Sequence, residues 1–184
     1  MSAKATQKRK KRHWLEINRA PVLTLWAGVV AECLGFDPDE ALTLGRAVAG
    51  LKAYSKGVSI GLFQPTPHEI KEKRRSLRKH EALTVDLLGR AVPVTQTDAG
   101  LRALGKDRPI KPDSVQRYLE SKFGDALDDA REAMMGLALS MSGADLAEYA
   151  YRLYEDFRPD VPSGAKGWGA AGRLDLDKIR HMAD

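Results

Sequence analysis

The chain has 184 residues, of which 43% are hydrophobic and only 7% aromatic, and its formal net charge is +5. A chain of this length can bury a core without disulfides, and this hydrophobic content excludes a wholly disordered protein. Its one cysteine, Cys33, excludes an internal disulfide and has apolar neighbours, which indicate a buried, inert thiol. The longest apolar run, residues 20–31, is too short to cross a bilayer. We therefore expect a cytoplasmic protein that does not bind membranes.

The positive charge is concentrated at the N-terminus. Residues 1–12 carry six Lys or Arg and no acid, which leaves 24 basic against 25 acidic residues in the rest of the chain. Because they have almost no apolar side chains to bury, residues 1–12 are predicted to be a disordered basic arm. A helical domain is expected over residues 13–158, with a Gly- and Pro-rich segment, residues 159–184, docked on it. Segment 111–160 is acidic, with eleven acids against six bases.

Two helices are predicted after the arm. Apolar residues recur at helical spacing over residues 14–34, and Gly35 can end that helix. Residues 37–40, Asp-Pro-Asp-Glu, form a helix-start pattern, in which the Asp side chain accepts from a backbone amide and Pro suits the first turn. A second helix is therefore expected over about residues 38–54.

A similar start pattern, Thr66-Pro67-His68-Glu69, precedes a long and strongly basic segment. We expect it to form a third helix that reaches about Leu88, with Gly89 as its C-terminal cap. The next stretch contains several Gly and Pro residues, so a loop or one short β-hairpin is expected around residues 91–110.

Further start patterns at Asp113, Asp125 and Ser142 predict three more helices, and Pro159 ends the last of them. A short turn is expected near residues 174–179. No repeat at a fixed period is present, so a solenoid is not indicated. The predicted fold is an all-α, compact helical bundle of about six helices.

The first two predicted helices are similar to the start of a helix-turn-helix motif, with Gly35 at the turn. A recognition helix presents polar side chains to base edges, however, and residues 41–51 are almost all apolar or small. Two packed core helices are the favoured interpretation, with Gly45, Ala49 and Gly50 allowing close approach.

Two short motifs are typical of enzymes, but neither has the required context. Residues 167–172 fit GxGxxG, yet no apolar strand precedes them and no βαβ unit can follow. Ser76-Leu77-Arg78-Lys79 fits SxxK without the companion motifs of penicillin-recognising enzymes. The four histidines are scattered and lack the spacing of metal ligands. The sequence therefore predicts no catalytic residues, no cofactor and no metal site, and it disfavours an enzyme.

The leading functional hypothesis is based on the basic residues of the arm and of the predicted third helix. A disordered polycation and a basic helix face are both suited to phosphate contacts, which bind any sequence. We therefore expect a small helical accessory or regulatory protein that binds nucleic acid without strong base specificity. The predicted contact residues are Lys8, Arg9, Lys10, Lys11, Arg12, Lys71, Arg74, Arg75, Arg78 and Lys79.

Two alternatives stay open. A helical protein–protein interaction module would use the basic helix to bind an acidic partner, or the acidic segment of a second copy in a homo-oligomer. A small-molecule-binding bundle would have a pocket lined by aromatic side chains. The candidate pocket walls are Trp26, Tyr54, Tyr151 and Trp168.

Overall fold

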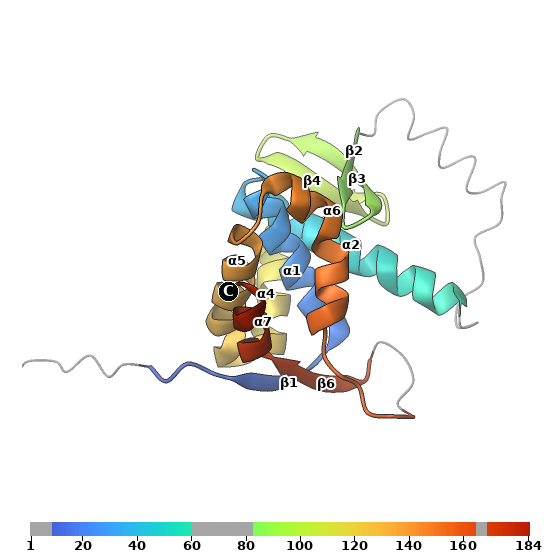
Figure 1. The fold of residues 1–184 in the computed structure, drawn as a ribbon. Coiled ribbons are helices and arrows are strands. Elements are labelled where there is room, and N and C mark those ends of the chain that lie inside the picture. Colours follow the sequence, from blue (N-terminus) through green and yellow to red (C-terminus); the bar gives the residue numbers. More distant parts are fainter. Residues whose placement is uncertain (1–8, 60–82, 165–168) are drawn as a thin grey trace, which may run out of the picture.

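A computed structural model of the chain describes residues 9–59, 83–164 and 169–184. Helices occupy the middle of the molecule, and a sheet lies at each end (Figure 1). The elements are β1 (Trp14–Asn18), α1 (Arg19–Cys33), α2 (Pro38–Ser59), β2 (Leu83–Leu87), β3 (Arg90–Thr97), β4 (Gly100–Gly105), β5 (Arg108–Pro109), α4 (Pro112–Phe123), the 3₁₀ turn η1 (Gly124–Ala126), α5 (Leu127–Leu139), α6 (Gly143–Phe157), β6 (Ala171–Asp175) and α7 (Leu176–Met182).

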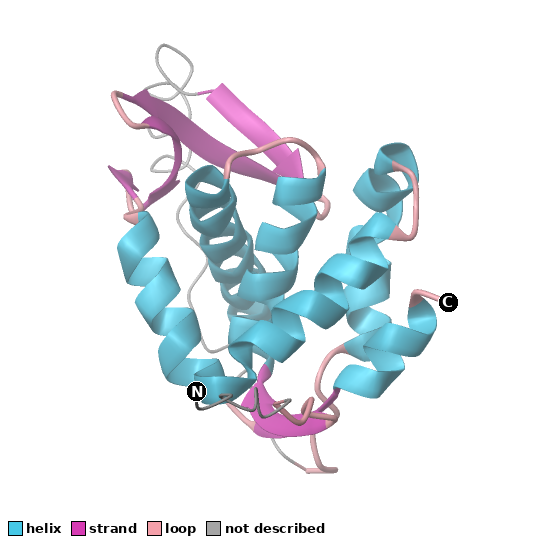
Figure 2. Cartoon of the chain, turned by 90° about the vertical axis from the view of Figure 1, so that its left-hand side faces the viewer, coloured by secondary structure: helices cyan, strands magenta, loops and turns pink. Residues whose placement is uncertain are grey.

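The prediction of an all-α helical bundle is wrong, because the fold is mixed α/β. One antiparallel sheet has the strand order β1-β6, and the other has the order β2-β3-β4-β5. In the view turned by 90°, the two sheets again lie at opposite ends of the helices (Figure 2). None of the described helices is long and apolar enough to cross a membrane.

Helix α1 is the centre of the core, because its sequence is apolar on every side. Residues 21–31 are all buried, and the helix contacts α2, α4, α5 and α6. Trp26 is completely buried, and its Nε1 donates to the carbonyl oxygen of Ala150 at 2.8 Å. Its ring meets that of Phe157 edge to face at 5.3 Å. A helix without a polar face is stable only in such a fully covered position.

Helices α1 and α2 approach each other closely at Gly45. A Cβ atom at Gly45 would clash with the carbonyl oxygen of Thr24 and lie 2.8 Å from the nitrogen of Gly28. Gly50, on the same helix, has no atom within 4 Å of such a Cβ. Only the first of these two glycines therefore permits the helix contact.

The predicted helix over residues 14–34 is shorter than expected, because residues 14–18 form strand β1. Leu15 and Ile17 are buried while Trp14 and Glu16 are exposed, which is the two-residue alternation of a half-buried strand. β1 pairs antiparallel with β6, so that Leu15 lies opposite Leu174. Periodicity within a short window does not reveal a partner strand more than 150 residues away.

Gly172 of the GxGxxG motif lies in β6 and serves a packing role. A Cβ atom there would clash with the carbonyl oxygen of Asp160. Asp160 forms two backbone hydrogen bonds with Arg173, each of 3.1 Å, so the chain lies directly against this strand. The glycine permits this close backbone approach.

The second sheet replaces the end of the predicted third helix and the predicted loop or single hairpin. Leu88 and Gly89 both have positive φ, as do Lys106 and Asp107. Two-residue turns of this kind join antiparallel strands because their twist matches that of the sheet. Gly89 was interpreted as a helix cap, which uses the same backbone conformation. The hydroxyl of Thr43 accepts from the amide of Ala103 at 3.0 Å and thereby joins this sheet to α2.

Candidate functional site

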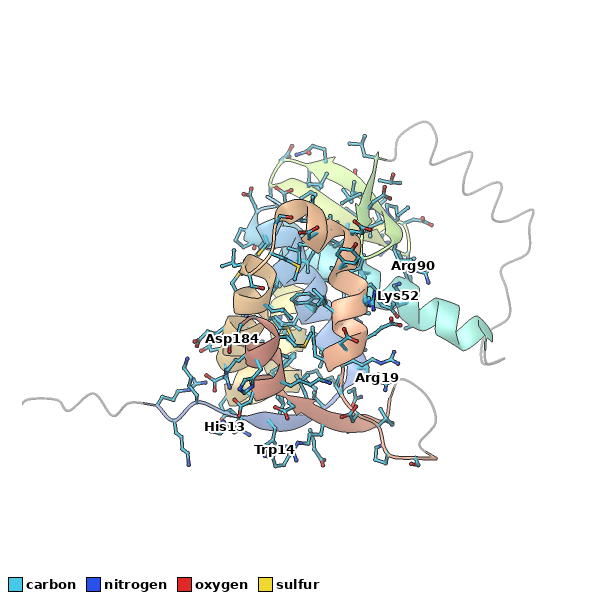
Figure 3. The ribbon with its side chains drawn as sticks, in the orientation of Figure 1. His13, Trp14, Arg19, Lys52, Arg90 and Asp184 are labelled. Atoms are coloured by element: carbon cyan, nitrogen blue, oxygen red, sulfur yellow. The ribbon has the colours of Figure 1, made fainter. Side chains whose placement is uncertain are left out.

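The two-stranded sheet presents an exposed aromatic ring. Because the residues of β1 alternate, the strand that buries Leu15 and Ile17 turns Trp14 outward, and Trp14 is 47% exposed. The guanidinium carbon of Arg173, on β6, lies 4.8 Å from the centroid of its ring. Figure 3 labels Trp14 at the start of this strand and His13 just before it.

A groove with a volume of about 690 Å³ runs beside the same strand. It is lined by residues 10–16 and by Lys122, Phe123 and Ala126, which lie at the end of α4 and in η1. We call this feature the basic groove, because its lining includes three lysines, an arginine and His13 against a single acid, Glu16. Seven of the lining residues, 10–16, are consecutive and belong to one non-helical segment that continues into β1.

Acids of η1 and α5 hold the part of the arm that the structure describes. The backbone amide of Arg12 donates to Oδ2 of Asp129 at 2.9 Å, and Asp129 is only 7% exposed. Arg9 lies 3.5 Å from the same carboxylate, and Lys11 pairs with Glu132 at 2.5 Å. These contacts place residues 9–12 against the first turns of α5. Residues 1–8 lie outside the described part of the chain, and the predicted domain boundaries stay a prediction.

The arm contacts divide the groove cations into two sets. Arg12 and Lys11 are paired with acids, Arg12 at 3.2 Å from Asp125. Within the described part of the chain, Lys10 and Lys122 have no carboxylate at ion-pair distance. Their charges are therefore free to attract an anion into the groove. The groove therefore combines two cations that have no carboxylate partner with an exposed aromatic ring.

Replacing Asp129 with Asn should lower stability at neutral pH by about 1 kcal/mol, and by less in acid. The hydrogen bond from the Arg12 amide is the largest cause that lowers the pKa of this carboxyl below its usual value. Burial raises the pKa, and the charge of Arg9 lowers it further. A carboxyl with a lowered folded pKa stabilises the protein above its unfolded pKa, about 3.9, and loses that contribution as pH falls through the folded value. Urea unfolding of both proteins at neutral pH and at about pH 2–3 measures the difference. An equal difference at both pH values would contradict this account.

The other predicted contact residues and pocket walls have different positions. Lys71, Arg74, Arg75, Arg78, Lys79 and Lys8 lie outside the described residues, and so does Trp168. The side chain of Tyr54 is also outside them, whereas Trp26 is part of the closed core. Tyr151 is half buried on α6, beneath Lys52.

Trp14 and Lys122 line the groove, although the sequence does not predict either as a contact residue. Helical spacing places Trp14 at the first apolar position of a predicted helix, whereas the alternation in Trp-Leu-Glu-Ile-Asn indicates a strand. Lys122 ends a helix far from the arm in sequence, and only the fold brings the two together. The part of the chain that the structure describes has no group of three or more His, Cys, Asp or Glu that could hold a metal ion.

The chain was compared with protein-family models, with curated proteins and with solved structures, and none of the three comparisons found a match.

Proposed function

We propose that this protein binds single-stranded nucleic acid in the basic groove, through phosphate contacts and without strong base specificity. The observation that carries the proposal is that two lysines without a carboxylate partner, Lys10 and Lys122, line the same groove as Trp14, whose side chain is 47% exposed. Cations that follow a nucleic-acid backbone, together with an aromatic ring on which a base can stack, are the usual elements of such sites.

Trp14 favours a single strand over a duplex. The bases of a duplex already stack on one another, whereas an unpaired base can leave its neighbours and stack on an indole ring. Arg173 covers part of the ring at 4.8 Å and is a further cation beside the stacked base. Since every base has a flat aromatic face, stacking of this kind tolerates any sequence.

The paired cations of the arm have a supporting role in this proposal. Arg9, Lys11 and Arg12 are held by acids of η1 and α5, and these ion pairs fix the segment that lines the groove. Lys10 lies between them in sequence and supplies its charge to the groove. The basic residues between 71 and 79 stay predicted contacts, and the proposal does not depend on them.

The double variant Lys10→Gln and Lys122→Gln should weaken binding roughly tenfold at low salt and flatten its salt dependence. For single strands the salt slope is about 0.7 per phosphate contact, so the loss of two contacts should lower it by about 1.4. Fluorescence anisotropy of labelled poly-dT and poly-U at several salt concentrations measures both quantities.

A matched control removes the same charge elsewhere. Arg108 and Lys111 are exposed residues in and just after β5, at the end of the molecule with the larger sheet. Their double change to Gln should leave affinity and salt slope close to the wild-type values. Equal losses in both double variants would show that net charge, and not the groove, determines binding. If poly-Glu displaced the strand at low concentration, the alternative of an acidic protein partner would be favoured instead.

A further inference from the structure

A second group of cations lies away from the basic groove, beside α6. Lys52 of α2 places its Nζ 3.4 Å from the centroid of the Tyr151 ring on α6. Arg90, the first residue of β3, lies close enough for its charge to act on Lys52. Figure 3 labels Lys52 and Arg90 next to each other on the same side of α6. Three separate elements thus bring two positive charges and a tyrosine together.

These charges lack a carboxylate partner among the described residues. No carboxylate within the described ranges lies at ion-pair distance from Lys52 or Arg90, although Glu155 is near enough to act on both Lys52 and Tyr151. The Nε of Arg90 is buried and has no hydrogen-bond acceptor. Burial and the neighbouring charge of Arg90 lower the pKa of Lys52. Two partly buried like charges repel each other, and a bound anion would relieve this repulsion.

The types of side chain favour a phosphate group as this anion. A guanidinium presents a fork of donors that matches two phosphate oxygens, and an ammonium adds a compact charge. Tyr151 lies near enough to Arg90 for that charge to act on its hydroxyl, which can serve as a further donor. We propose that Lys52, Arg90 and Tyr151 form a binding site for a phosphate group, separate from the basic groove. None of the three lines that groove, so this site is independent of the proposed function.

Titration of the isotope-labelled full-length protein with inorganic phosphate tests this site. At constant ionic strength, maintained with chloride, the Arg90 Nε–H resonance in nitrogen–proton NMR spectra should shift and reach saturation in the millimolar range. Lys52→Met keeps the apolar stem over the Tyr151 ring and removes only the charge, so it should weaken phosphate binding at least tenfold. Lys111→Met, a change of an exposed lysine in a different region, should have no effect.

Two further ligands distinguish free phosphate from the phosphate of a nucleotide. Adenosine monophosphate and a 5′-phosphorylated oligonucleotide are titrated in the same way, each against its form without the phosphate. Saturation by any of the three phosphates, with loss in Lys52→Met, supports the site, and the ligand of highest affinity identifies its source. The proposal would be overturned if the Arg90 Nε–H resonance shifted linearly, without saturation, with all three phosphates. It would also be overturned if Lys52→Met bound phosphate with the wild-type affinity. The wild-type titration is decisive even if a variant does not fold.

Discussion

Replacing Gly45 with Ala should lower the unfolding free energy by about 1–3 kcal/mol, a large effect for one methyl group. The added Cβ would meet two backbone groups of α1, the carbonyl oxygen of Thr24 and the amide nitrogen of Gly28, and neither can rotate away. Either the two helices must move apart, or the contact strains them. Each kcal/mol should lower the Tm by about 2–4 °C in a chain of this size, which thermal unfolding followed by circular dichroism measures.

The same substitution at Gly50 is the matched control. Gly50 lies on the same helix, is exposed, and has open space where its Cβ would be. Alanine is the better helix former, so Gly50→Ala should stabilise the protein by about 0.5–1 kcal/mol. If Gly45→Ala were as stable as wild type, the close contact between α1 and α2 described here would be wrong.

Elements with strong local signals could be predicted from the sequence. Helix α2 begins at Pro38, as the start pattern predicts, because Pro fits the first turn of a helix whatever packs against it. The side chain of Ser142 accepts from the amide of Asp145 at 3.1 Å, which is the capping interaction that the sequence indicates. Both interactions are made within a few residues, so no knowledge of the tertiary structure is needed.

Elements that depend on distant partners could not be predicted. Residues 83–87 continue a charged, helix-like segment, and only their pairing with β3 makes them a strand. Strand β1 similarly depends on β6, near the other end of the chain. The conformation with positive φ at Gly89 occurs in helix caps and in hairpin turns alike, so the residue itself does not distinguish them. Strand content was therefore underestimated.

The candidate site could be predicted in part. Lys10 lies in the arm that the sequence identifies as basic, and it lines the groove. The sequence predicts Asp125 only as the start of a helix, whereas Asp125 and Asp129 both hold the arm through Arg12. Pairing of this kind between segments more than 100 residues apart has no local signature. Similarly, the exposure of Trp14 follows from the strand register and not from its residue type.

Trp14→Ala should cause a large loss of affinity for single strands. Stacking of one base on an aromatic side chain is worth about 1–3 kcal/mol, so affinity should fall roughly 5- to 150-fold. The salt slope should stay at its wild-type value, because no phosphate contact is removed. Trp14→Phe keeps an aromatic ring and should recover much of the affinity. Leu139→Ala removes an apolar side chain that is 69% exposed on α5, and it should bind as the wild type does.

Anisotropy of labelled poly-dT with wild-type protein and Trp14→Ala, at a low and a moderate salt concentration, tests the central claim most directly. We expect the wild-type protein to bind poly-dT more tightly than a duplex of the same length. The variant should lose affinity for poly-dT by a similar factor at both salt concentrations. Absence of binding by the wild-type protein at low salt, or a variant with wild-type affinity, would contradict a nucleic-acid site at the basic groove.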